Sequence, residues 1–249
     1  MRVTAVRVHT EESRGRYAEV LGHISSGKLD RLQRFRHNKD FNLGLMAELL
    51  IRTMIGEELG LANSALRIVP DNNGKPQLEG IADFHFNVAH SGEWVACITD
   101  RQPVGIDVEQ IKEVEPGIAR RFFTEQEAAD LDRLTGVERT RAFYRLWTLK
   151  ESYMKADGRG MRLGLDTFSF SIDDSVGSPG IKLNTELLLQ HCSFRLYDCC
   201  PGYELAVCAM HDSFPDEASV WDEEELLRRF ESIRSPYNFL QAGKRRGHP

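Results

Sequence analysis

Apolar side chains recur along much of the chain with a period of two, which is the period of a β-strand. In residues 167–172, for example, Phe168, Phe170 and Ile172 alternate with two serines. Because successive side chains of a strand point to opposite faces, this pattern predicts a strand with one buried face. We expect strands at 2–8, 66–69, 84–88, 94–99, 104–109, 167–172, 193–197 and 203–210.

Other segments repeat their apolar residues every three to four positions, as an amphipathic helix does. In 38–59, Phe41, Leu45 and Leu49 share one face, and Gly60 follows as a typical helix terminator. We expect helices at 14–24, 29–36, 38–59, 124–134, 138–157 and 221–233. The chain is therefore predicted to mix helices with strands.

The composition bounds the class of protein. Of the 249 residues 41% are hydrophobic, which is enough for one large core or two ordinary ones, and we place a boundary at the proline-containing turn 100–103. The net charge of −6 argues against nucleic acid or an anionic membrane as a partner. No run of apolar residues has the length of a signal peptide core or of a membrane span, so we expect a cytoplasmic protein.

The helix predicted at 138–157 carries a row of chemically active residues. Trp147, Glu151 and Lys155 lie at positions i, i+4 and i+8, which places them on one face. Alone, this row could be a surface ion pair. The strand predicted at 104–109 adds Asp107 and Glu109, whose side chains point the same way because they are two residues apart. Three carboxylates on two adjacent rigid elements can hold one hard divalent cation.

These two segments carry a resemblance. Gly105-Ile-Asp-Val-Glu109 is followed, 44 residues on (151 − 107), by Trp147-Thr-Leu-Lys-Glu-Ser-Tyr-Met-Lys155. In order and spacing they resemble the paired signature of the 4'-phosphopantetheinyl transferases, above all the longer, monomeric type that activates surfactin synthetase (Sfp type). Residues 74–76 and 86–92 also stand where that family has comparable segments.

The resemblance implies a fold. It would be an α+β fold of two similar α/β lobes in a pseudo-twofold arrangement, in a monomer. The N-terminal lobe would comprise 1–103 and contact the phosphate and adenine of coenzyme A. The C-terminal lobe would comprise 104–220 and hold the metal and the signature helix. A C-terminal helix and a basic tail would fill 221–249, with disorder expected at 244–249.

The resemblance also implies a reaction, the transfer of 4'-phosphopantetheine from coenzyme A to a serine of an apo peptidyl or acyl carrier protein, with release of 3',5'-ADP. Mg²⁺, which Mn²⁺ can replace, would be held by Asp107, Glu109 and Glu151. Glu151 would orient or deprotonate the serine, directly or through water, and Lys155 would neutralise charge on the phosphate. The residues implied in binding coenzyme A are Lys28, Arg31, Lys75, His90 and Lys155. Lys150 would be a helper or face solvent.

Taken alone, the basic residues have plainer explanations. Lys28 and Arg31 belong to a run of cations in 28–39, and such runs are usually solvated helix faces. Lys75 lies in a segment of turn-forming residues, and a histidine at a strand end, such as His90, is more often structural than catalytic.

Two positions depart from the family pattern. Gly44 stands where a hydroxyl or basic side chain often helps to bind phosphate, and Ala89 stands where serine is frequent. Coenzyme A affinity would then depend more on the neighbouring cations. A further set of apolar residues beside Arg120 and Arg121 could receive the carrier protein or could be core. These residues are Ile111, Ile118, Phe122 and Phe123.

Two other classes of function remain open from the residues. A coenzyme A-binding regulator would need Lys28, Lys75 and His90 but not the metal carboxylates. A metal-dependent phosphohydrolase would need the carboxylates, with water as the nucleophile. The presence of both sets favours group transfer.

Overall fold

The structure is a computed structural model, and it describes residues 1–173, 180–186 and 191–234. The tail at 244–249 lies outside these residues. The strands are β1 (Arg2–Arg7), β2 (Ile68–Pro70), β3 (Pro76–Leu78), β4 (His85–Ser91), β5 (Trp94–Asp100), β6 (Val104–Gln110), β7 (Ser169–Asp173), β8 (Gly180–Asn184), β9 (Ser193–Leu196), β10 (Tyr203–Ala209) and β11 (Ser219–Asp222). The α-helices are α1 (Ala18–Leu21), α2 (Ser26–Gln33), α3 (Asn38–Leu59), α4 (Ile118–Phe122), α5 (Glu125–Asp132), α6 (Gly136–Asp157) and α7 (Glu223–Arg234). The predicted mixture of helices and strands is confirmed.

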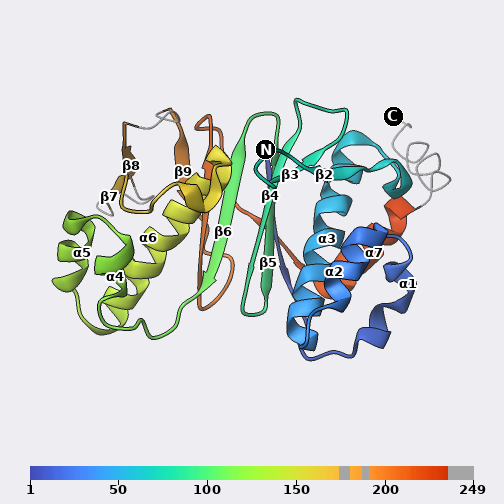
Figure 1. The fold of residues 1–249 in the computed structure, drawn as a ribbon, viewed down its shortest axis with the longest axis horizontal. Helices are drawn as coiled ribbons and strands as arrows, with labels where there is room; N and C mark the ends of the chain where they lie inside the picture. Colours follow the sequence, from blue (N-terminus) through green and yellow to red (C-terminus); the bar gives the residue numbers. More distant parts are fainter. Residues whose placement is uncertain (174–179, 187–190, 235–249) are drawn as a thin grey trace.

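Two β-sheets stand at the centre of the molecule, with helices on their outer faces (Figure 1). The first sheet has the order β11-β1-β5-β4, in which β1 and β11 are parallel and the other neighbours antiparallel. The second sheet, β6-β10-β9, is antiparallel. Helices α3 and α7 pack on the first sheet and α6 packs on the second. We call the two sides the first-sheet half and the second-sheet half.

Strand alternation explains how one sheet contributes to two cores. On β5, Val95 and Cys97 face α3, whereas Trp94, Ala96 and Ile98 pack toward the second sheet. All residues of β5 and β10 are buried, as expected for strands that are covered on both faces. The central core between the sheets fixes the position of the two halves relative to each other.

The two halves meet along β4 and β6, which contact each other although they belong to different sheets. The side-chain oxygens of Asn87 and Ser91 on β4 accept hydrogen bonds from the backbone N–H groups of Ile106 and Gln110 on β6, at 3.0 and 3.2 Å. Buried backbone N–H groups at a sheet edge need acceptors, and here side chains supply them. This seam holds the strand that carries the candidate metal ligands.

The β4–β5 hairpin differs from the prediction, which ended the strand at Val88. Strand β4 continues to Ser91, so the connecting turn is only Gly92 and Glu93. Gly92 has φ +60°, a conformation that L side chains rarely adopt. A two-residue hairpin turn with glycine is favoured because its twist matches that of the strands.

The described end of the chain returns to the first-sheet half. Strand β11 pairs in parallel with β1, and Leu226, Phe230 and Ile233 of α7 join the core around α3. The expected helix from Trp221 begins instead at Glu223, and Trp221 lies in β11. An edge strand of four residues is too short to show a clear period. Among the described residues no helix has the length and apolar character needed to cross a membrane.

Candidate active site

The candidate site is built where α6 crosses the outer face of β6. The apolar residues Ile106 and Val108 point into the core between the sheets, so Asp107 faces the opposite way, toward α6. The close approach depends on Gly105. A Cβ atom there would lie 1.9 Å from the carbonyl oxygen of Ser152 and 2.6 Å from the backbone nitrogen of Ala156. Only glycine lets the helix backbone rest directly on the strand.

Asp107 is the most deeply buried carboxylate of the site, with 4% of its surface exposed. Its Oδ1 accepts a hydrogen bond of 2.6 Å from Lys155 Nζ, whereas its buried Oδ2 has no hydrogen-bond partner in the described chain. Burial raises the pKa of Asp107, although the Lys155 ammonium opposes that shift. A buried oxygen without a partner is costly and needs an explanation such as a ligand.

Glu109 and Glu151 are half-buried beside Asp107. Ser91 Oγ donates to Glu109 Oε2 at 2.7 Å across the seam, whereas Glu151 makes no hydrogen bond or ion pair with another described residue. Burial and the charge of Asp107 raise the pKa of both side chains. Three carboxylates that repel one another in this way form a site for positive charge.

The donor set fits a hard divalent cation. All three side chains offer oxygen, and one oxygen of Asp107 is buried and unpaired. In their present positions the three side chains do not form a metal-binding cluster. The described residues contain no group of three or more His, Cys, Asp or Glu side chains that is arranged to hold a metal ion. The three carboxylates are thus neighbours in space, as predicted, but their oxygens do not converge on one point.

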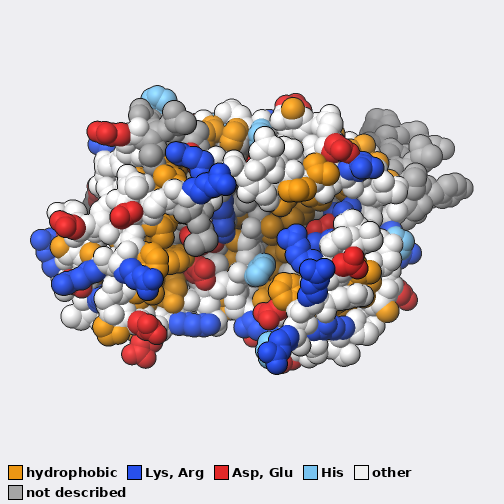
Figure 2. Space-filling model, in the orientation of Figure 1, with side chains coloured by type: hydrophobic (Ala, Val, Ile, Leu, Met, Phe, Trp, Pro, Cys, Tyr) orange, Lys and Arg blue, Asp and Glu red, His pale blue; other side chains and the backbone are white. Residues whose placement is uncertain are grey.

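Positive charge faces the carboxylates from the first-sheet half. Partial loss of water around the ring of His90 on β4, together with the positive charges of Lys155 and Lys28, lowers the pKa of His90. Lys28 Nζ on α2 lies 3.4 Å from Glu48 Oε2. The other carboxylate oxygen, Glu48 Oε1, lies 2.6 Å from Arg52 Nε. Figure 2 shows the molecule hollowed between the halves, with Lys and Arg side chains gathered over α2.

The other two predicted cofactor residues lie differently. Arg31 is exposed on α2 and pairs with no described residue. Lys75 directs its ammonium group at backbone carbonyls of β6 and α6, including that of Lys155, so it is not pointed at the open hollow. The structure therefore brings Lys28, His90 and Lys155 together, whereas the ammonium group of Lys75 is directed at backbone carbonyls.

Comparison with known proteins identifies the family of this chain. A family model for the 4'-phosphopantetheinyl transferase superfamily matches residues 103–208, and a model for the N-terminal part of 4'-phosphopantetheinyl transferases matches residues 11–102. The 4'-phosphopantetheinyl transferase Sfp of Bacillus subtilis (strain 168) is 38% identical over 209 residues, which are 83% of this chain and 91% of that protein. The chain belongs to the 4'-phosphopantetheinyl transferase superfamily.

A second 4'-phosphopantetheinyl transferase of Bacillus subtilis is 36% identical over 227 residues, 91% of this chain and 100% of that protein. A solved holo-(acyl-carrier-protein) synthase from Bacillus anthracis str. Ames, in complex with CoA (3',5'-ADP), aligns with a TM-score of 0.35 and 21% identity over 45% of this chain and 96% of that one. The family membership predicted from the two motifs is confirmed, and the protein is a transferase.

The two departures from the family pattern have structural reasons. A Cβ at Gly44 would lie 2.8 Å from Leu32 Cδ2 and 3.4 Å from Phe35 Cε2, so α2 packs closely over this point of α3. Ala89 is buried in the core between the sheets. Neither position therefore presents an open place that a hydroxyl group could use for a ligand.

Lys150 neither faces solvent nor reaches the site, contrary to both options that we considered. Its side chain is fully buried, and its ammonium binds Glu127 Oε2 at 2.8 Å and the carbonyl oxygens of Leu165 and Phe168 at 2.7 and 2.6 Å. Burial lowers its pKa, opposed by Glu127. Lys150 points away from Glu151 because adjacent helix positions do not share a face.

Three residues of this network were missed by the sequence analysis. Ser91 and Asn87 bind β6 across the seam, and Glu48 joins Lys28 to the buried Arg52. The sequence shows that Asn87 and Ser91 are an even number of residues apart, so they share one face of β4. Nothing in the sequence identifies their partners. Glu48 and Arg52 are four residues apart on a helix, a spacing that does predict an ion pair.

Proposed function

We propose that this transferase moves the 4'-phosphopantetheine group of coenzyme A to a serine of an apo peptidyl or acyl carrier protein in a reaction that depends on Mg²⁺. One observation carries the proposal. Asp107, Glu109 and Glu151 lie beside Lys155 at the seam, opposite Lys28 and His90. A polyanionic substrate needs such cations, and its metal needs such carboxylates.

The first-sheet half supplies the phosphate clamp in this proposal. Lys28 and His90 flank the same space, and the exposed Arg31 lies within reach of solvent one turn along α2. We assign the 3'-phosphate to these three side chains. The turn that carries Lys75 lies at the junction of the two halves, and in this proposal it lies beside the adenine nucleotide.

The second-sheet half supplies the metal ligands. Asp107, Glu109 and Glu151 would hold Mg²⁺, which Mn²⁺ can replace, and the buried unpaired Asp107 Oδ2 is the best prepared ligand. When bound, the ion would neutralise negative charge on the pyrophosphate. Lys155 adds a positive charge of the protein's own at the same place.

Glu151 receives the serine proton. Because burial and Asp107 raise its pKa, it is a stronger base than an exposed glutamate. The serine oxygen forms a bond to the β-phosphorus, the bond from that phosphorus to 3',5'-ADP breaks, and Lys155 stabilises the charge that develops on the phosphate oxygens. Glu151 takes the proton directly or through one water.

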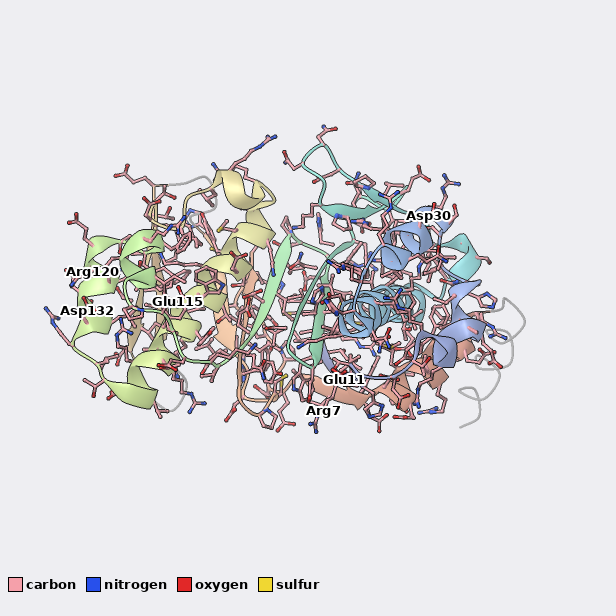
Figure 3. All side chains as sticks on the ribbon, turned by 60° about the horizontal axis from the view of Figure 1, so that its bottom comes forward. Arg7, Glu11, Asp30, Glu115, Arg120 and Asp132 are labelled. Carbon is pink, nitrogen blue, oxygen red and sulfur yellow. The ribbon has the colours of Figure 1, made fainter. Side chains whose placement is uncertain are left out.

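The carrier protein would dock over α4. Phe123 is core, since only 3% of it is exposed, but Phe122 is half-buried edge-on to Trp147 at 5.7 Å between ring centres. Figure 3 labels Glu115 on the loop before α4, and Arg120 and Asp132, which form an ion pair of 2.7 Å, farther out on the same half. An apolar centre with a charged rim suits a protein partner.

The wider expectations belong to the same proposal. The two halves, each with a sheet and one long helix, would be lobes related by a pseudo-twofold axis, in a cytoplasmic monomer that binds neither nucleic acid nor membrane.

The proposal is tested by mixing the protein with an apo carrier protein, coenzyme A and Mg²⁺ and measuring the intact mass of the carrier. Gain of the phosphopantetheine mass, lost with a chelator, is expected.

The same experiment separates the two alternative functions. A phosphohydrolase would cleave coenzyme A without adding mass to the carrier. A coenzyme A-binding regulator would leave both molecules unchanged. Either result would contradict group transfer.

A further inference from the structure

Lys75 differs from the other predicted lysines because its ammonium group binds backbone carbonyls, whereas those of Lys28 and Lys155 pair with carboxylates. Its Nζ donates to the carbonyl oxygens of Lys155, of Ala156 at 3.5 Å and of Val104 at 3.4 Å. An ammonium group has three N–H donors, and three carbonyls face them here. The side chain therefore has no donor left for a phosphate group.

The acceptors lie where a cation has most effect. The last carbonyls of a helix lack partners within the helix and carry its partial negative charge, so a nearby cation stabilises that end. Helix α6 ends at Asp157 because Gly158 takes a left-handed conformation with φ +81°. The aliphatic stem of Lys75 passes Gly158, with Cδ 3.7 Å from the point where a Cβ would stand.

The lysine is presented by a stiff hairpin tip between β2 and β3. Asp71 Oδ1 accepts hydrogen bonds of 2.8 Å from the backbone N–H groups of both Asn73 and Lys75, and Asp71 N donates to Lys75 O at 2.8 Å. Gly74 provides the positive φ of +86° that the tip requires. The backbone of such a tip therefore loses little further freedom when the lysine side chain binds.

We propose that Lys75 is a positioning residue, which connects the first-sheet half to the last turn of α6 and thereby sets the place of Lys155. The carbonyl of Lys155 itself is one acceptor, and the Lys155 ammonium binds Asp107 Oδ1 at 2.6 Å. The effect on catalysis rests on the proposed function; the effect on α6 does not. Lys75 acts on the helix and not on the nucleotide.

The test compares Lys75→Met with the parent and with Lys182→Met. Methionine keeps the length and apolar stem of lysine but removes the charge and all donors. Lys182 is exposed on β8, so its substitution removes the same charge without touching α6. Lys75→Arg, which restores a cation with several donors, is the conservative variant.

Two readouts are combined. Hydrogen exchange of the ligand-free protein should become faster in the segment 150–160 for Lys75→Met, and Lys75→Arg should restore part of the protection. In steady-state transfer, kcat should fall by about 10- to 100-fold, since small misplacements of catalytic groups have effects of that order. The Kd for coenzyme A should change by less than about threefold, because no charge-assisted bond to phosphate is lost.

A loss of coenzyme A affinity of tenfold or more, with unchanged exchange in 150–160, would show that Lys75 is a nucleotide ligand and overturn the proposal. Unchanged exchange together with an unchanged kcat would overturn it as well. The exchange measurement stays informative even if the protein transfers nothing, so failure of the proposed function is recognised separately. If Lys75→Met does not fold, Lys75→Leu, which also lacks the charge and all donors, gives the same readouts.

Discussion

Helices α3 and α6 are each 22 residues long, end at a left-handed glycine and cover one sheet, yet they treat their charged residues in opposite ways. In α3 the buried Glu48 and Arg52 bind each other. In α6 Glu151 has no described partner, and Lys155 reaches across to another element. Buried charges that are fully paired support the fold, whereas charges left unpaired near one another mark the place where a ligand completes the arrangement.

The contrast also exists within α6, at two adjacent positions. Lys150 is enclosed by Glu127 and two carbonyls, while Glu151 faces the seam. The sequence motif contains both, so it cannot separate a structural residue from a catalytic one. Their different surroundings lead to different expected losses on substitution.

The largest loss of transfer without loss of fold is expected for Asp107→Ala. Because burial already raises the pKa of this carboxyl group, its removal costs the fold little, and Lys155 stays partly solvated. We expect transfer to fall by at least about 10²-fold, the lower end of what a lost charge at a reacting centre costs. Intact-mass assay and thermal melting are the measurements. Metal-dependent transfer at the parent rate would remove Asp107 from the site.

Lys150→Met should have the reverse profile. It leaves Glu127 buried and without its ion-pair partner, and breaking one side of a buried pair costs about 3–5 kcal/mol. We expect that loss in the free energy of unfolding, measured with urea at neutral pH. The double variant Lys150→Met/Glu127→Gln should recover part of it. A stability equal to that of the parent would contradict the structural role of the Lys150–Glu127 pair.

Substitutions in the phosphate clamp should weaken the binding of coenzyme A. Lys28→Ala and Arg31→Ala should each weaken coenzyme A binding by about 10- to 150-fold, which corresponds to one charge-assisted hydrogen bond of about 1.5–3 kcal/mol. Calorimetric titration with coenzyme A and with dephospho-coenzyme A is the measurement, and the second ligand should be affected far less. Equal binding by parent and variants would make the basic stretch a solvated helix face.

The smallest effect concerns His90 and pH. The pKa of His90 lies below the ordinary value of 6.5, so the ring is neutral at pH 7 in the free protein. As the pH falls below 6.5, the unfolded chain binds the proton more readily than the folded protein does. The free energy of unfolding therefore decreases in that range. A bound 3'-phosphate favours the charged ring. Coenzyme A binding, relative to dephospho-coenzyme A, should therefore strengthen as the pH falls, by at most about tenfold per pH unit. His90→Gln should abolish this difference.

Local features of the fold and site were predictable from the sequence. The two-residue period put Asp107 and Glu109 on one face, and Gly60 and Gly158 marked the ends of both long helices. The seam was not predictable, because the pairing of Ser91 with Glu109 joins residues 18 positions apart through tertiary packing. The burial of Lys150 was missed for the same reason. Its partner Glu127 also forms the capping box of α5 with Thr124.

The central claim is that Glu151 of α6 does chemistry while Glu48 of α3 supports the fold, and substitution of each by glutamine tests it directly. Glu151→Gln keeps shape and helix propensity but removes the base, so holo-carrier formation should fall by about 10²- to 10⁴-fold, while coenzyme A titration changes far less. Glu48→Gln should instead lower the melting temperature, because Arg52 loses its charged partner. A loss of transfer below about tenfold for Glu151→Gln, or an equal loss in transfer and in coenzyme A affinity, would contradict the proposed mechanism.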